Sequence, residues 1–183
     1  MNRIKLPYWK SIHTIIYDFD GVFTNNLVYV DQEGVESVGC NRLDGLGINL
    51  IQSFLYSKCH KINQFILSTE KNKVVTSRAN KMNLKCYQGI KNKLEFIKNY
   101  LAENFNNDYL QAKGIIYIGN DLNDYHAMKF VGFSIAPNDA HPKIIELANY
   151  VLKQNGGEGC VRGFIEEFIE INTFKNSELE NFI

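Results

Sequence analysis

Ile15-Ile16-Tyr17-Asp18-Phe19-Asp20-Gly21-Val22-Phe23-Thr24 is the stretch of sequence that decides the fold. The apolar run from Ile12 to Tyr17 has the length of a strand, and its β-branched isoleucines favour a strand over a helix. Residues i and i+2 of a strand point to the same side, so Asp18 and Asp20 are expected to face one space. Gly21 then allows the chain to turn.

Paired carboxylates at this place predict chemistry at phosphorus. Ligands of open α/β sheets bind beyond the carboxyl ends of the strands, where these two aspartates would lie. Carboxylates suit a hard cation such as Mg²⁺, and an aspartate can act as a nucleophile. An Asp-x-Asp triplet alone is a weak signal, because a polar loop after a buried strand would look the same.

The composition is that of one globular domain. The chain has 183 residues, 45% of them hydrophobic and 22% charged, and its 20 basic residues balance 20 acidic ones. This balance predicts no nucleic-acid partner, and the lack of a long apolar run predicts no membrane association. Residues 1–10 lack the apolar core of a signal peptide. Cys40, Cys59, Cys86 and Cys160 form no CxxC pair, which favours reduced thiols and a cytoplasmic location.

Strand and helix patterns alternate along the rest of the chain. This order predicts an α/β fold with a Rossmann-like, mostly parallel sheet and helices on both faces. Further strands are predicted at 62–67, 84–87, 115–118, 132–136 and 150–152. Helices are predicted at 44–56, with Asp44 as the cap, and at 72–82, 91–101, 122–130, 141–148 and 161–170. We expect a single domain over residues 1–171 and a flexible tail at 172–183.

Residues 27–38 predict a β-hairpin directly after the aspartates, in a segment of about 25–40. The hairpin is either a flap over the aspartates or a decoration of the sheet edge, and the local pattern fits both.

Polar side chains recur where the predicted strands end. Ser68 and Thr69 follow the second strand, where a hydroxyl either binds a phosphate oxygen or caps the next helix. Lys91 and Lys93 stand in the first turn of a helix, where a cation opposes the helix dipole, so one of them is a candidate anion ligand. Residues 119–124, Gly-Asn-Asp-Leu-Asn-Asp, repeat the acidic pattern at the end of a further strand.

Taken together, these motifs resemble the four motifs of the haloacid dehalogenase superfamily of phosphohydrolases over residues 12–168. The subgroup that the chain looks like contains the 3-deoxy-D-manno-octulosonate 8-phosphate phosphatases, the nonulosonate 9-phosphate phosphatases and the phosphatase-like domain fused to some acylneuraminate cytidylyltransferases. The residues that carry this narrower resemblance are Asp18–Thr24, Asp44-Gly45-Leu46-Gly47-Ile48, Gln88-Gly89, Asn92-Lys93-Leu94 and Gly156-Gly157-Glu158-Gly159-Cys160-Val161-Arg162. Ser68-Thr69-Glu70-Lys71-Asn72 replaces the Thr-Gly-Arg of the octulosonate enzymes and looks closer to the other two branches.

The resemblance implies a Mg²⁺-dependent phosphatase of a phosphorylated acidic keto-sugar, in lipopolysaccharide or sialic acid synthesis. Asp18 would attack phosphorus and form an aspartyl-phosphate, Asp20 would act as general acid and then as general base, and Ser68 and Lys93 would hold the phosphoryl oxygens. The residues implied as magnesium ligands are Asp18, Asp20, Asn120 and Asp121. Those implied as substrate contacts are Gly21, Asp44, Thr69 and Arg162, the last through a substrate carboxylate.

The same resemblance implies a homotetramer, in which the hairpins pack together and the glycine-rich segment approaches a neighbour's active site. A cytidylyltransferase is the other implied protein partner.

Two departures from the family pattern bear on activity. Asn120 stands where the family usually has a metal-binding aspartate, so either Asn120 ligates or Asp121 or Asp124 supplies the charge. Asn25-Asn26 stands where Asp-Gly commonly follows the threonine. The alternative to an enzyme is therefore a non-catalytic relative that serves as an oligomerisation or partner module. A receiver domain of a response regulator also gathers acids on a parallel sheet, but the hairpin argues against it.

Overall fold

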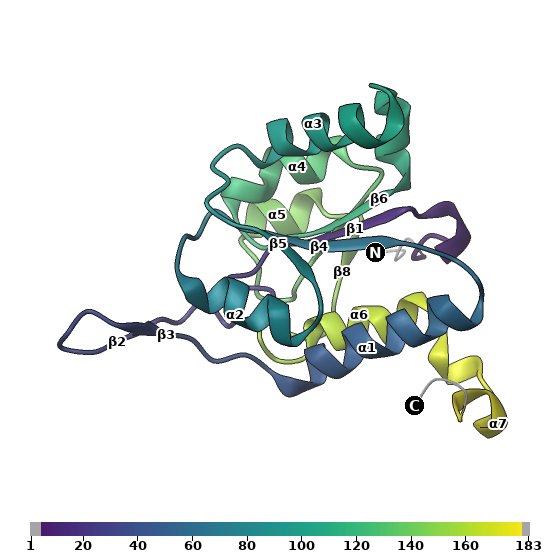
Figure 1. The fold of residues 1–183 in the computed structure, drawn as a ribbon, viewed down its shortest axis with the longest axis horizontal. Helices are drawn as coiled ribbons and strands as arrows, with labels where there is room; N and C mark the ends of the chain where they lie inside the picture. Colours follow the sequence, from purple (N-terminus) through teal and green to yellow (C-terminus); the bar gives the residue numbers. More distant parts are fainter. Residues whose placement is uncertain (1–4, 181–183) are drawn as a thin grey trace.

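The computed structural model describes residues 5–180. Its centre is a six-stranded sheet in which all strand pairs are parallel, in the order β5-β4-β1-β6-β7-β8 (Figure 1). The strands are β1 Thr14–Tyr17, β4 Asn63–Leu67, β5 Lys85–Tyr87, β6 Ile115–Ile118, β7 Phe133–Ala136 and β8 Tyr150–Val151. The predicted α/β fold and its parallel sheet are confirmed.

Strand β1 is a central strand of the sheet and has a neighbouring strand on each side. It pairs with β4 on one side, with Tyr17 opposite Ile66, and with β6 on the other, with Tyr17 opposite Ile118. The residues that follow these three strands therefore meet at one edge of the sheet. A crevice at such a switch in strand order is where open α/β sheets bind ligands.

Helices cover both faces of the sheet, as the alternating pattern predicted. One layer contains α1 Arg42–Ser57, α2 Lys73–Lys81 and α6 Cys160–Phe168, and the other contains α3 Lys93–Phe105, α4 Tyr125–Phe130 and α5 Pro142–Leu147 (Figure 1). The short helices are the 3₁₀ turns η1 Trp9–Ser11, η2 Tyr109–Gly114, η3 Leu122–Asp124 and η4 Ile171–Thr173, and α7 Asn176–Leu179. Because both faces of β1 and β6 are covered, every residue of these two strands is buried.

The predicted hairpin is present and stands away from the body of the molecule (Figure 1). Its strands β2 Tyr29–Val30 and β3 Glu36–Ser37 are antiparallel and exposed. The Asp31 carboxylate closes the loop by accepting hydrogen bonds from the N–H groups of Glu33 and Val35. Asn72, at the start of α2, donates from Nδ2 to Glu36 Oε2 at 2.8 Å.

Several local predictions differ from the structure at helix starts. Asn41, and not Asp44, caps α1 by accepting from the Leu43 N–H, and Asn72 caps α2 in place of Ser68 or Thr69. The helix predicted at 122–130 is a 3₁₀ turn followed by α4, because Asp121 and Asp124 form a capping box that tightens its first turn.

The predicted tail begins within the described part of the chain and ends outside it. Residues 181–183, like residues 1–4 of the lead-in, lie outside the described residues. In the described part, Phe174 stacks on Phe54 of α1, with ring centroids 5.9 Å apart. Among the helices of residues 5–180, none combines the length and apolar character that crossing a bilayer requires.

Candidate active site

A cavity of about 300 Å³ lies at the carboxyl edge of the sheet, beyond β1, β4 and β6. Its walls come from segments far apart in the sequence: Asp18, Asp20, Asn26, Thr69, Asn120, Asp121 and Asn123. Five of these were predicted as site residues from their positions at strand ends. The parallel alignment of the strands brings them together.

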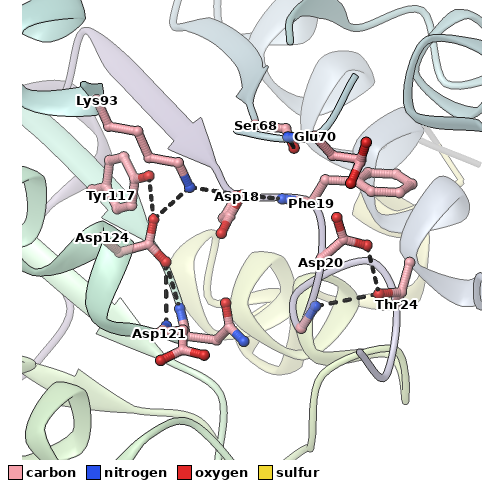
Figure 2. A network of polar contacts seen from close by, with 12 residues as sticks. Asp18, Phe19, Asp20, Thr24, Ser68, Glu70, Lys93, Tyr117, Asp121 and Asp124 are labelled. Atoms are coloured by element: carbon pink, nitrogen blue, oxygen red, sulfur yellow. Dashed lines mark hydrogen bonds and ion pairs between the residues drawn. The ribbon is translucent and has the colours of Figure 1, made fainter. Parts of the chain in front are cut away.

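Asp18 is held by a buried ion triad. Lys93 Nζ lies 2.8 Å from Asp18 Oδ1 and 2.6 Å from Asp124 Oδ1, so one ammonium joins two carboxylates (Figure 2). The Phe19 N–H donates to Asp18 Oδ1 at 2.7 Å, and the Tyr117 hydroxyl donates to Asp124 Oδ1 at 2.7 Å. Lys93 lies in the first turn of α3, as predicted, and its side chain points toward Asp18 (Figure 2).

The charges of this triad do not balance. Burial, followed by the charge of Asp124, raises the pKa of Asp18 to about 8, although Lys93 opposes the rise. Burial alone would lower the pKa of Lys93, but the charges of Asp18 and Asp124 raise it above its ordinary value. Lys93 therefore stays protonated, and Asp18 keeps its proton up to about pH 8 because one ammonium cannot balance the charges of both carboxyl groups.

Asp20 sits in the turn that follows β1. Its Oδ1 accepts a hydrogen bond from Thr24 Oγ1 at 3.3 Å, and Thr24 Oγ1 accepts from the Gly21 N–H at 3.2 Å (Figure 2). Burial raises the pKa of Asp20 and the Thr24 hydrogen bond lowers it, with a net rise. Gly21 has a φ of +75°, and a Cβ there would lie 1.8 Å from Asn120 Nδ2, so this position requires glycine.

The hydroxyl residues after β4 face Asp18 from the other side. Ser68 is buried, and its Oγ accepts a hydrogen bond from the Glu70 N–H at 3.0 Å. Its hydroxyl proton is therefore available for another acceptor. Thr69 lines the cavity. Figure 2 shows Ser68 close to Asp18 and Glu70 beyond it, next to Phe19.

The oxygen donors at the cavity fit a hard divalent cation. Of the residues that the structure describes, no basic side chain lines the cavity, whereas three carboxylates and the Asn120 amide do. Within residues 5–180, no three His, Cys, Asp or Glu side chains form a metal-binding cluster, so a cation would also need the Asn120 amide, main-chain oxygen and water. Mg²⁺ accepts such mixed oxygen ligands and keeps several waters. Asp124 is engaged by Lys93 and by the Asn120 N–H, whereas the Asp121 carboxylate beside Asn120 is held only by main-chain N–H groups, among them that of Leu122 at 2.7 Å.

The other two predicted substrate residues do not reach this cavity. Asp44 is fully buried in α1, and its Oδ1 accepts from the Arg162 N–H at the start of α6 at 3.0 Å. Burial raises the pKa of Asp44 to about 6, and the N–H groups of Arg162 and Val161 oppose the rise. The Arg162 side chain pairs with Glu166 at 2.7 Å beside a different hollow. Within one chain, Asp44 therefore anchors two helices and Arg162 lies away from the aspartates.

The glycine-rich loop before α6 supports the turn that follows β1. Gly157 N–H donates to the Val22 carbonyl at 3.0 Å, and the Cys160 thiol donates to the same oxygen at 3.1 Å. A Cβ at Gly157 would lie 2.5 Å from the Thr24 carbonyl carbon and the Asn25 nitrogen. The close approach of these two loops therefore depends on glycine.

Four residues of the site were not predicted, and one of them is Asn123, which lines the cavity. Thr24 and Tyr117 act through hydrogen bonds to Asp20 and Asp124, and spacing rules carry no signal for such contacts. Asn26 lines the cavity with a left-handed φ of 65°. The sequence did carry one signal for Asn26, because it stands at a position where the family commonly has glycine.

Comparison with known proteins agrees with this geometry. Residues 11–164 match the family model of the haloacid dehalogenase-like hydrolases. The chain is 36% identical over 154 residues to the 3-deoxy-D-manno-octulosonate 8-phosphate phosphatase of Yersinia pestis, covering 83% of this chain and 76% of that protein. It is 33% identical to the Escherichia coli K12 enzyme of the same name, covering 84% and 77%.

Solved structures agree as well. A putative hydrolase of the same family from Streptomyces avermitilis superposes with a TM-score of 0.79 at 32% identity, covering 90% of this chain and 94% of that one. The crystal structure of the Yersinia pestis phosphatase superposes with a TM-score of 0.76 at 33% identity, covering 88% and 83%. The resemblance seen in the sequence is confirmed: this chain belongs to the haloacid dehalogenase-like hydrolases and is a phosphoric monoester hydrolase.

Proposed function

We propose that this chain hydrolyses the phosphate ester of an acidic keto-sugar through an aspartyl-phosphate on Asp18, with Mg²⁺ as cofactor. The observation that carries the proposal is the buried triad of Lys93, Asp18 and Asp124 beneath a cavity that also holds Asp20. Lys93 fixes one oxygen of Asp18, which leaves the other to attack phosphorus.

Asp20 is the proposed acid and base. In the first step it donates a proton to the sugar oxygen as the phosphorus–oxygen bond breaks, so the sugar leaves as a neutral alcohol. In the second step the carboxylate takes a proton from the water that attacks the aspartyl-phosphate, which releases phosphate and restores Asp18. The raised pKa of Asp20 suits a group that must first hold a proton.

The phosphoryl oxygens would be held by Ser68 and Lys93. The Ser68 hydroxyl is oriented by its bond from the Glu70 N–H, and Lys93 supplies a fixed positive charge where the oxygens gain charge in the transition state. Asp18, the Asp20 carbonyl, Asn120 and Asp121 would hold Mg²⁺. When bound, the cation offsets repulsion between the carboxylates and the phosphate dianion.

The sugar acid is proposed from the relatives and from the cavity rim. The relatives named above act on 3-deoxy-D-manno-octulosonate 8-phosphate. The rim residues Asn26, Thr69 and Asn123 are neutral hydrogen-bonding groups, which suit a leaving group rich in hydroxyls. Ser68-Thr69-Glu70 in place of Thr-Gly-Arg keeps a nonulosonate 9-phosphate as the second candidate.

Phosphate release tests the proposal. The purified protein is assayed with octulosonate 8-phosphate and with neuraminate 9-phosphate, with Mg²⁺ and with EDTA, and Asp18→Asn is the control. Turnover that needs Mg²⁺ and vanishes in the variant is expected, and the two rates rank the sugars. Folded protein without turnover on either ester would refute the proposal and favour the non-catalytic partner module, including one that serves a cytidylyltransferase.

We also propose a homotetramer that packs through the hairpin. Leu27, Tyr29, Val30 and Val35 expose between 56% and 62% of their surface on a segment that stands clear of the body. Such a row favours burial against another surface. In this assembly, Arg162 would approach the site of a neighbouring copy, a role it does not have within one chain. Light scattering that gives a monomer would refute the assembly.

A further inference from the structure

The geometry points to Asn26 as a specificity-determining residue whose side-chain amide binds hydroxyl groups of the leaving sugar. This inference rests on the proposed phosphatase function and deepens it. The family resemblance implies no role for this position, where asparagine replaces the usual glycine.

Asn26 occupies a backbone conformation that favours glycine. Its φ is 65°, in the left-handed region where side chains other than those of asparagine and aspartate are strained. Despite this, the residue carries a side chain, and Asn26, which is exposed to solvent, is one of the residues that line the cavity with Asp18 and Asp20. Within residues 5–180 the Asn26 amide group has no hydrogen-bond partner, so both its donor and its acceptor are available to a ligand.

The backbone of Asn26 is tied to the proposed proton donor. The Asn26 N–H donates to Thr24 Oγ1 at 3.2 Å, and Thr24 Oγ1 donates to Asp20 Oδ1 at 3.3 Å. One hydroxyl thus fixes Asn26 relative to Asp20. Since Asp20 must lie next to the leaving oxygen, Asn26 lies on the leaving-group side of the cavity and not on the side of the transferred phosphate.

The chemistry of this side matches a sugar. The groups on the phosphate side are charged, namely Asp18 and Lys93, whereas Asn26 offers a neutral amide with two donor hydrogens and an acceptor oxygen. A neutral amide pairs well with a hydroxyl, which is both donor and acceptor. It would gain nothing from a leaving group without polar atoms.

A purely conformational role for Asn26 makes the opposite prediction. If asparagine were present only to fit the left-handed turn, glycine would fit at least as well. Asn26→Gly would then leave both folding and turnover unchanged. A matched control exists at Asn107, which has a φ of 62° and is exposed outside the cavity.

The test compares wild type, Asn26→Gly, Asn26→Asp and Asn107→Gly in two assays with Mg²⁺. One substrate is octulosonate 8-phosphate, and the other is 4-nitrophenyl phosphate, whose leaving group has no hydroxyl to bind. We expect Asn26→Gly to lower kcat/KM for the sugar phosphate about 10-fold, the loss of one or two net hydrogen bonds, and to leave the nitrophenyl ester within about 2-fold. Asn26→Asp keeps the turn but adds a negative charge to a cavity that Asp18 and Asp20 already line, so it should lower kcat/KM for both esters, and the selective loss is expected of Asn26→Gly alone. Asn107→Gly should change neither substrate, and no variant should lower Tm.

The outcomes separate the inference from the proposed function. An active wild type whose sugar-phosphate kcat/KM is unchanged in Asn26→Gly refutes the inference alone. An equal fall on both substrates in Asn26→Gly also refutes it, because Asn26 would then act on the turn after β1. A wild type that hydrolyses neither ester refutes the proposed function, and the inference falls with it.

Discussion

Replacing Lys93 by methionine tests the charge balance beneath the cavity. Lys93 is 2% exposed and is the ammonium that joins Asp18 and Asp124, at 2.8 and 2.6 Å. Methionine retains most of the apolar stem, so the change removes a charge with little loss of packing. Two buried carboxylates would then face each other without a cation.

The expected cost follows from the cost of breaking a buried ion pair. Removing one partner leaves an uncompensated buried charge, at about 3–5 kcal/mol. That is a large share of the 5–15 kcal/mol that typically stabilises a domain. Without Lys93 the pKa of Asp18, already raised to about 8, would rise further. A carboxyl with a raised folded-state pKa stabilises the fold at low pH and loses that contribution as pH rises through its pKa. Because wild-type Asp18 holds its proton up to about pH 8 and the variant holds it to a higher pH, the deficit of Lys93→Met should change little between pH 5.5 and pH 7 and widen above pH 8.

The assay is urea unfolding followed by circular dichroism, in EDTA so that no cation substitutes for the lysine. The matched variant is Lys93→Met combined with Asp124→Asn, which removes one of the two stranded carboxylates. We expect the double variant to recover about 2 kcal/mol relative to the single one, because the two sites are in direct contact. A single variant within about 1 kcal/mol of wild type, or a double variant that is less stable than the single one, would refute this account of the triad.

Three further predictions concern other parts of the site. Asn120→Asp adds a charged ligand and should tighten Mg²⁺ binding about 10-fold by titration calorimetry; unchanged affinity would place Asn120 outside the ligand set. Asp44→Asn removes a carboxyl whose pKa is about 6, so stability should fall less from pH 5 to pH 7 than in wild type, by about 1 kcal/mol, with turnover retained; lost turnover would restore Asp44 to the site. Gly157→Ala forces a Cβ to 2.5 Å from the turn at Thr24 and should cost about 1–3 kcal/mol and lower kcat; an unchanged Tm would show that the two loops are not closely packed.

Strand ends were the most predictable part of the site. Asp18, Asp20, Thr69, Asn120 and Asp121 were all expected at one edge, and all line one cavity. The prediction succeeds because parallel strands place their carboxyl ends together whatever the loops do. Ser68 and Lys93 lie near Asp18 for the same reason. Ser68 follows β4, and Lys93 is at the start of the helix that follows β5.

Predictions failed where a polar group had two possible partners. Asp44 looked like a helix cap because it stands near the start of a helix, but Asn41 starts that helix one turn earlier and Asp44 bonds the N-terminus of α6 instead. That contact depends on how α1 packs against α6, which local pattern does not encode. The ion pair between Lys93 and Asp124 was not predicted either. The sequence indicated Asp124 as a source of negative charge for the metal ion and not as a partner of the lysine.

The turn after β1 and the glycine-rich loop that supports it are made at different times on the ribosome. Asp18 and Asp20 emerge early, but the Val22 carbonyl waits for the N–H of Gly157 and the thiol of Cys160, which are made near the end of the chain. Strand β1 likewise waits for β6 to cover its second side. Such distant pairing delays folding until the last contacts are available. A nascent chain therefore carries Asp18, the proposed nucleophile, well before it carries the loop that supports the turn after β1.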